Sequence, residues 1–408
     1  MPRWQWIVKE LLSRIWFRAA WIGLLSVILA LAAAGLAPLL PYDLSLKIGA
    51  NAADNILTIL ASSMLAVTTF SLTAMVTAFS GAAQLGTPRA TELLIEDSTA
   101  QNALSTFLGG FLFAIVGIIA LSTGLYGEQG RAILLIGTIM MIAWIVITLL
   151  RWIGRLAYFG RVGDTIKRVE KKAAKALRSY PGPRLLAGRA DIDIPVDARI
   201  VAAPRTGYVA HADRKGLSDL AVMDEIQITL AAPAGHFVAM GDPLAWTAHG
   251  ELSDEDVLDQ FFIRRARDLD QDPRFGMVVL SEIASRALSP AVNDPGSAIA
   301  TLVSGQRVLE RFLTGSDDYA ALPGLVDHPL SLEEMVEDLV LPIARDGAAL
   351  VEVGIQLQKM LGGLARAFPG SRNALYRIAQ DAHARACEAI ASQADRDRLD
   401  RAHRTAFA

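Results

Sequence analysis

Few residues in this sequence have types and spacings that suggest chemistry, and the densest group is one loop. It reads Ser-Pro-Ala-Val-Asn-Asp-Pro, and its polar or rigid members are Ser289, Pro290, Asn293, Asp294 and Pro295. A ligand or ion could contact these residues at the N-terminus of the following helix, where the helix dipole attracts anions. The same residues suit a structural turn, in which Pro290 ends one helix and Asn293 and Asp294 cap the next. We favour the structural interpretation and keep the ligand site as the alternative.

The histidines and the single cysteine do not indicate a metal centre. His211, His236 and His249 lie near acidic residues but lack the short ligand spacings of a zinc site. Cys387 is the only cysteine, which excludes an intrachain disulfide and a multi-cysteine cluster. The sequence also lacks a Ser-His-Asp pattern, a phosphate loop and a glycine-rich nucleotide fingerprint. We therefore expect no catalytic residue, no metal and no cofactor, and we do not expect an enzyme.

A stripe of hydroxyl side chains runs along the apolar segment 55–80. When successive residues are rotated by about 100°, most of its hydroxyls fall within an arc of about 100°. A polar stripe on a membrane helix must face protein or water, because hydrocarbon offers it no hydrogen-bonding partner. It therefore either packs against another helix or lines a pore formed by several copies. The residues expected to line such a pore, including apolar collars at Leu65 and Val76, are Thr58, Ser62, Leu65, Thr69, Thr73, Val76, Thr77 and Ser80.

The composition of the chain places this segment in a membrane. Of 408 residues, 52% are hydrophobic, and the apolar excess lies before residue 151. A transmembrane helix needs about 20 mostly apolar residues. Four such spans are predicted, at about 20–40, 55–80, 104–124 and 132–150.

The charges that flank these spans predict their orientation. Basic residues precede the first span and follow the fourth, whereas the loops 41–54 and 125–131 carry few. Basic flanks stay on the cytosolic side, so we expect a multi-pass protein of the inner (plasma) membrane with both termini cytosolic. The formal net charge of −3 gives no attraction to nucleic acid. The expected partners are the lipid bilayer, further copies of the chain, and an ion or small solute.

Changes in composition divide the chain into five parts. We expect an interfacial amphipathic helix at 1–19, a four-span transmembrane domain at 20–157, a connecting helix and linker at 158–190, a small β domain at 191–250 and a helical domain at 251–408. The fold class is thus a membrane α-helical part with four transmembrane helices and a cytosolic α+β part.

The β domain is expected to be a small barrel. Alternating apolar residues between turns at proline and glycine predict short strands. Residues 235–244 resemble the turn of biotinyl and lipoyl barrel-sandwich folds, but no lysine occupies a tight hairpin to carry a prosthetic group. The resemblance therefore implies no cofactor. Beyond this domain we expect a bundle of helices that begins with one from Ser253 to Leu269 and continues with two amphipathic helices at about 275–288 and 296–313. The charged residues 394–408 are expected to fray.

Three separated motifs resemble one family. They are the stretch Phe-Ser-Leu-Thr-Ala-Met-Val-Thr-Ala-Phe-Ser-Gly-Ala-Ala-Gln-Leu-Gly-Thr-Pro-Arg-Ala at 70–90, Gln-Asp-Pro-Arg-Phe-Gly at 271–276, and Ala-Leu-Ser-Pro-Ala-Val-Asn-Asp-Pro at 287–295. Together they resemble a family of prokaryotic predicted membrane proteins known as domain of unknown function number twenty-two fifty-four. The resemblance implies an inner-membrane protein with a cytosolic C-terminal half. It brings no established activity and no catalytic residues.

Two functions remain in view. The first is a homo-oligomeric channel, in which the second span lines a weakly selective pore for an ion or small solute and the cytosolic domain supports or gates it. The second is a membrane-anchored sensor or scaffold whose cytosolic domain binds a ligand or protein partner. The spans carry no buried charge of the kind that a proton-coupled transporter normally uses.

Overall fold

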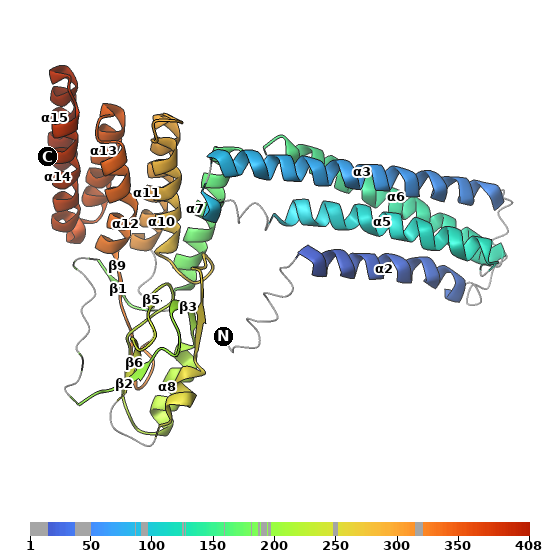
Figure 1. The fold of residues 1–408 in the computed structure, drawn as a ribbon, viewed down its shortest axis with the longest axis horizontal. Coiled ribbons are helices and arrows are strands. Elements are labelled where there is room, and N and C mark those ends of the chain that lie inside the picture. The colour runs from blue at the N-terminus through green and yellow to red at the C-terminus, as the bar shows by residue number, and fades with distance from the viewer. Residues whose placement is uncertain are drawn as a thin grey trace. The chain divides into compact units, whose positions relative to one another are not determined.

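The fold was obtained as a computed structural model. The structure describes residues 15–36, 50–85, 87–90, 97–124, 126, 128–158, 160–180, 182–186, 188, 194, 197–247, 252–314 and 321–408. The chain divides into two compact units, each of which is described by itself (Figure 1). One consists of apolar helices and is called the apolar helical unit. The other consists chiefly of residues 162–408 and is called the C-terminal unit.

Long helices build the apolar helical unit. In chain order they are α2 (Ile15–Leu36), α3 (Ala50–Leu85), α5 (Ser98–Ser122) and α6 (Glu128–Leu156). Among the described residues, the segments Ala53–Gly81, Ser98–Ser122 and Gly130–Leu156 are long and apolar enough to cross a membrane. The apolar part of α2 is the shorter Phe17–Ala32. Three candidate spans are therefore present, and the predicted count of four is not confirmed.

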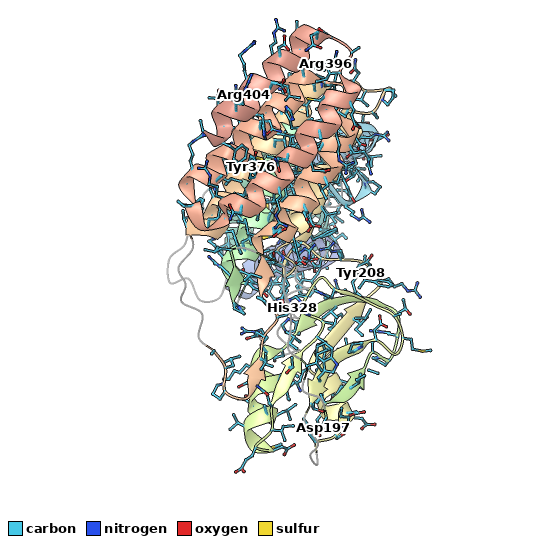
Figure 2. The ribbon with its side chains drawn as sticks, turned by 90° about the vertical axis from the view of Figure 1, so that its left-hand side faces the viewer. Asp197, Tyr208, His328, Tyr376, Arg396 and Arg404 are labelled. Atoms are coloured by element: carbon cyan, nitrogen blue, oxygen red, sulfur yellow. The ribbon has the colours of Figure 1, made fainter. Side chains whose placement is uncertain are left out.

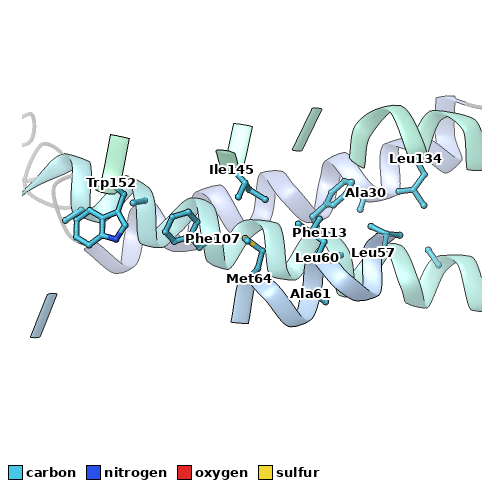
Figure 3. Close-up of a cluster of buried hydrophobic side chains, with 14 of the residues drawn as sticks. Ala30, Leu57, Leu60, Ala61, Met64, Phe107, Phe113, Leu134, Ile145 and Trp152 are labelled. Atoms are coloured by element: carbon cyan, nitrogen blue, oxygen red, sulfur yellow. The ribbon is translucent and has the colours of Figure 1, made fainter. Parts of the chain in front are cut away.

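Glycines of α5 lie where neighbouring helices of this unit contact it. At Gly109 of α5, an added Cβ would lie 3.0 Å from the Ile22 side chain of α2, and at Gly117 it would lie 3.1 Å from Leu57 of α3. Small residues permit the close approach of α2 to α5, whereas α3 reaches α5 through side chains such as Leu57. Leu57 is one of several fully buried side chains in the core of the unit, which Figure 3 shows together with Phe107 and Trp152.

A buried polar contact and an ion pair also join the helices. Trp152 of α6 donates from Nε1 to the Ser71 hydroxyl of α3 over 3.1 Å. Asp97 caps the N-terminus of α5 by accepting from the backbone N–H groups of Thr99 and Ala100. The same carboxylate accepts from Arg155 Nε at 2.7 Å, and its side chain is only 3% exposed. Both carboxylate oxygens of Asp97 therefore have partners in the structure.

Helices form most of the C-terminal unit. They are α7 (Val162–Ser179), α8 (Arg214–Met223), α9 (Asp254–Leu258), α10 (Phe275–Ala287), α11 (Pro295–Thr314), α12 (Leu332–Asp346), α13 (Val351–Ala367), the short 3-10 helix η2 (Pro369–Ser371), α14 (Arg372–Ala389) and α15 (Gln393–Phe407). Two predicted helices, at about 275–288 and 296–313, are confirmed by α10 and α11.

Short strands form three small sheets in the same unit. The strands are β1 (Arg184–Leu185), β2 (Arg199–Ala202), β3 (Gly207–Ala212), β4 (Ile228–Leu230), β5 (Phe237–Val238), β6 (Pro243–Thr247), β7 (Phe261–Arg264), β8 (Leu325–Val326) and β9 (Leu330–Ser331). Their orders are β2-β6-β4-β8, β5-β3-β7 and β1-β9. Among the described strands these sheets stay separate and no closed barrel forms. The predicted small barrel is therefore not confirmed.

The helix predicted from Ser253 to Leu269 is wrong beyond its first turns. Ser253 does cap a helix, by accepting from the N–H of Glu255, but that helix ends at Leu258. The chain then runs as strand β7, which pairs antiparallel with β3. Phe261 and Ile263 alternate with more exposed neighbours and are buried in the core of the sheets. This pairing buries the apolar residues that a helix would have placed on several sides.

The prediction that residues 394–408 fray is also wrong. They belong to α15, which is capped by Ser392 and packs against α13 and α14. Leu399 is fully buried, and the backbone oxygen of Ala406 accepts from Arg366 of α13 at 2.7 Å. The N-terminal helix predicted at 1–19 lies mostly outside the described residues.

Two adjacent glycines of α13 test this packing. At Gly362 an added Cβ would meet the Cβ of Ala406 in α15 at 2.5 Å, whereas at Gly363 the nearest atom is Gln306 Nε2 at 3.5 Å. We expect Gly362→Ala to destabilise the unit by about 1–3 kcal/mol through overpacking. Gly363→Ala should stabilise it by up to about 1 kcal/mol, since alanine favours helix over glycine. Thermal unfolding of the purified protein measures both, and equal effects would contradict a packed α15.

Candidate functional site

The hydroxyl stripe lies on the outward side of α3. All eight residues predicted to line a pore are exposed, namely Thr58, Ser62, Leu65, Thr69, Thr73, Val76, Thr77 and Ser80. The opposite side of α3 is buried within the unit through Leu57, Met64 and Met75. Within one copy, then, the stripe does not serve to pack α3 against the described residues of its neighbours. It is available to a second copy, to lipid or to water.

The hydroxyls of this stripe bond to their own helix. Ser62 donates to the Thr58 backbone oxygen over 3.0 Å, Thr69 to that of Leu65 over 2.9 Å, and Thr73 to that of Thr69 over 3.0 Å. Such bonds to the preceding turn satisfy each hydroxyl proton without another helix. The oxygen of each hydroxyl keeps acceptor capacity that it can offer outward. Ser62, Thr69 and Thr73 are thus satisfied within α3, which is compatible with a surface that faces water or lipid.

The loop 289–295 acts as a helix cap in the structure. Asp294 accepts from the Ser297 backbone N–H at 3.0 Å and from the Ser297 hydroxyl at 2.7 Å, at the start of α11. These hydrogen bonds, that from the Ser297 side chain above all, lower the pKa of Asp294. Asn293 adopts the left-handed conformation at a φ of 49°, which asparagine tolerates better than most residues. The capping role explains both residues, and the alternative of a ligand contact stays a prediction.

A cavity of about 240 Å³ lies beside the motif at 271–276, within the C-terminal unit. Its walls come from segments far apart in the sequence: Tyr180, the turn 233–237, the loop before α10, and the stretch before α12. Tyr208 and His328, which Figure 2 labels, both line it. The family resemblance in the sequence singles out residues 271–276. It gave no signal that Tyr208 and His328, 120 positions apart in the numbering, meet there.

The buried carboxylate of Asp272 organises this cavity. It accepts from Arg267 Nε at 2.6 Å and from the backbone N–H groups of Arg274 and Phe275 at 3.1 and 3.0 Å. Burial raises the pKa of Asp272 above its usual value, against the opposing effect of Arg267. Gly235 packs against the same carboxyl group with a φ of 96°, so a side chain there would be both strained and obstructed.

The arginines of the cavity are engaged in ion pairs. Besides Arg267, Arg274 contacts Glu334 at 2.7 Å and Asp338 at 2.8 Å. This local pairing is what the interleaved charges near residues 264–274 predict. Since each guanidinium already has a carboxylate, the cavity is not built to bind a free anion.

The imidazole of His236 is neutral at physiological pH. Its ring meets that of His328 edge to face with centroids 5.1 Å apart. Burial, with smaller effects from His328 and the nearby arginines, lowers the pKa of His236 to about 4. The cavity thus offers neutral imidazole and phenol groups, which suit a small polar ligand better than a charged one. The sequence also offers His211 and His249 as candidate metal ligands. His211 Nδ1 contacts Gln271 Oε1 at 2.6 Å, and His249 lies outside the described residues.

Comparison with known proteins gives a family but no activity. The model of a family described as "Predicted membrane protein (DUF2254)" matches residues 12–362. Uncharacterized proteins of Mycobacterium bovis and Mycobacterium tuberculosis are each 35% identical over 113 residues, which is 26% of this chain and 22% of theirs. The match thus spans about a fifth of the length of these curated relatives. No solved structure matches the chain.

The lowered pKa of His236 predicts that the free energy of unfolding falls in acid. Between pH 6.5 and about 4, the unfolded chain binds a proton at His236 that the folded protein does not. The stabilisation is therefore complete above pH 6.5 and is lost as the pH falls toward 4, by at most about 3 kcal/mol. We expect His236→Gln to flatten the fall in free energy of unfolding over this window. The control is the range above pH 7, where the difference between the two proteins should be constant. An equal acid-induced loss in both proteins would contradict this origin.

Proposed function

This chain belongs to the DUF2254 family of predicted membrane proteins, and we propose that it forms a homo-oligomeric channel of the inner membrane. The observation that carries the proposal is the exposed hydroxyl arc of α3, opposite the side that packs within its own unit. Several copies that turn this arc toward a common axis would enclose a water-filled path. A single copy cannot enclose one with an arc that lies on its outside.

The chemistry of the arc suits a weakly selective pore. Its hydroxyl oxygens can replace part of the hydration of a passing ion or polar solute, and none of the eight residues is charged. Leu65 and Val76, each 56% exposed, interrupt the hydroxyls. As rings of apolar side chains they would form constrictions that close by losing water.

The remaining exposed surface of the unit suits lipid. Phe70 on α3 and Trp144 and Leu150 on α6 are each more than 60% exposed. We propose that α2 completes a four-span arrangement with both termini cytosolic, because basic residues flank the first and last apolar segments. In this arrangement the C-terminal unit lies in the cytosol, where it supports or gates the pore. The proposal includes no catalytic step.

Substitutions at the centre of the arc test the pore. We expect Thr69→Leu and Thr73→Leu to reduce solute flux or conductance in proteoliposomes by at least about tenfold, the effect of a barrier raised by about 1.4 kcal/mol. Leu65→Ser and Val76→Ser should increase it by removing a constriction. The matched control is Thr148→Leu on α6, because Thr148 is partly exposed and donates to the Trp144 backbone oxygen of its preceding turn over 2.9 Å. An unchanged flux in the arc variants, or no flux at all, would reject the channel.

The number of copies in the assembly tests the proposal independently. Native mass spectrometry or electron microscopy of the detergent-purified protein should give a closed ring with α3 at its axis. A monomer, or a dimer with α3 between its own neighbours, would assign the hydroxyl arc to packing or lipid.

The cavity beside residues 271–276 favours a second candidate, a membrane-anchored sensor or scaffold. A partly buried neutral histidine, two tyrosines and a volume of about 240 Å³ would suit a small polar ligand. The two functions differ in what they require of the membrane helices. A scaffold would keep its function when its spans are replaced by unrelated apolar helices, whereas a channel would lose it.

A further inference from the structure

Three potential metal ligands converge between the last two helices of the chain. His383 and Cys387 lie one turn apart on α14, and Asp400 reaches them from α15. One ligand atom from each lies within 4.8 Å of the others. Because residues spaced by four share a helix face, α14 alone supplies two donors to one point. This pairing was visible in the sequence, but Asp400 could be added only once α15 was known to pack against α14.

Two of the three distances among these atoms match those around a small cation. Cys387 Sγ lies 3.5 Å from His383 Nε2 and 3.8 Å from Asp400 Oδ1. Ligands that bind a tetrahedral ion with bonds of about 2.0–2.3 Å lie about 3.3–3.8 Å from one another. His383 Nε2 and Asp400 Oδ1 are closer, at 2.7 Å, as in a hydrogen bond. A cation between them would replace the shared proton and require a separation larger by about half an ångström.

The geometry does not fit a cysteine nucleophile. In such a site the base contacts the thiol through one ring nitrogen, and the orienting carboxylate holds the other. Here Asp400 bonds to Nε2, which is also the ring nitrogen nearer to the sulfur, with Nδ1 at 3.9 Å. Donors that converge on one point are instead what a cation requires.

A second layer of contacts fixes the His383 ring. The ring of His403 stacks on it with centroids 4.6 Å apart and planes inclined by 28°. His403 is held in turn by Gln358 Oε1 at 2.8 Å, and the fully buried Gln358 donates to the Ala379 backbone oxygen at 3.0 Å. Such outer contacts orient metal ligands and are part of a built site.

We propose that His383, Cys387 and Asp400 bind a divalent cation of the zinc type, which links α14 to α15. A thiolate with an imidazole and one carboxylate selects Zn²⁺ over Mg²⁺ or Ca²⁺, which prefer oxygen ligands. Three protein ligands leave a fourth position for water or a further ligand. The His383 side chain is 23% exposed and that of Asp400 43%, so a cation can enter from solvent.

The test uses the full-length protein in detergent, first stripped with a chelator and then given Zn²⁺ or Co²⁺ alone. We expect one zinc per chain by elemental analysis and a thiolate-to-cobalt charge-transfer band in the near ultraviolet. Cys387→Ser should abolish the band, and Asp400→Asn should weaken zinc binding by at least about tenfold. Asp381→Asn is the matched control, since Asp381 lies on α14 in an exposed ion pair with Arg385; it should change neither measurement.

Thermal unfolding separates loss of the site from loss of the fold. Zinc should raise the unfolding temperature of the wild type and the Asp381→Asn variant but not that of Cys387→Ser or Asp400→Asn. If the cysteine variant does not fold, Asp400→Asn alone decides. Absence of zinc binding, or equal binding and an equal cobalt spectrum in wild type and Asp400→Asn, overturns the proposal. Neither outcome depends on whether the protein conducts.

Discussion

The Leu57 and Met64 side chains of α3 pack onto the glycines of α5, and the orientation of the hydroxyl arc depends on this contact. An added Cβ at Gly110 would lie 3.5 Å from the Met64 side chain and 2.7 Å from the terminal methyl group of Ile145, so a larger residue would require the Ile145 side chain to shift. With Leu57 and Met64 held against α5, the opposite face of the helix can only point outward. That face carries Thr69 and Thr73. The side chains of α3 that meet the glycines of α5 thus lie opposite the face that α3 offers to its surroundings.

In the C-terminal unit a single buried carboxylate has a comparable role. Asp272 holds Arg267, caps the start of α10 and packs against Gly235 of the turn before β5. Three segments therefore depend on one side chain, which is why an acidic residue lies where burial is unfavourable for its charge. The cavity is a consequence of this junction: the sheets and the helices meet around Asp272 and leave a space lined by His236 and His328.

The sequence predicts what depends on local pattern. The apolar helices, α10, α11 and the cap at Asp294 follow from periodicity, proline positions and capping residues. It does not predict what depends on distant pairing. Residues 261–264 form a strand because they pair with β3, which lies far from them in the sequence. Helix α15 has few apolar residues, yet its Leu399 and Ala406 fill spaces on α13 and α14. The cavity and the group around Cys387 likewise join residues whose meeting only tertiary structure determines.

The internal hydrogen bonds of α3 change what its polar face implies. Unsatisfied hydroxyls in hydrocarbon would force the helix to find a partner before or during insertion. Because Ser62, Thr69 and Thr73 donate to their own helix, each copy can insert as a stable unit and assemble afterwards. The force that would bring the arcs of several copies together is therefore weak if it comes from the hydroxyls alone. Specific assembly would then depend on the exposed apolar residues that flank the arc, such as Ile59 and Phe70, and on contacts outside the membrane. In the proposed channel the hydroxyl face would provide the polar surface, and other surfaces of the chain would determine how many copies share it.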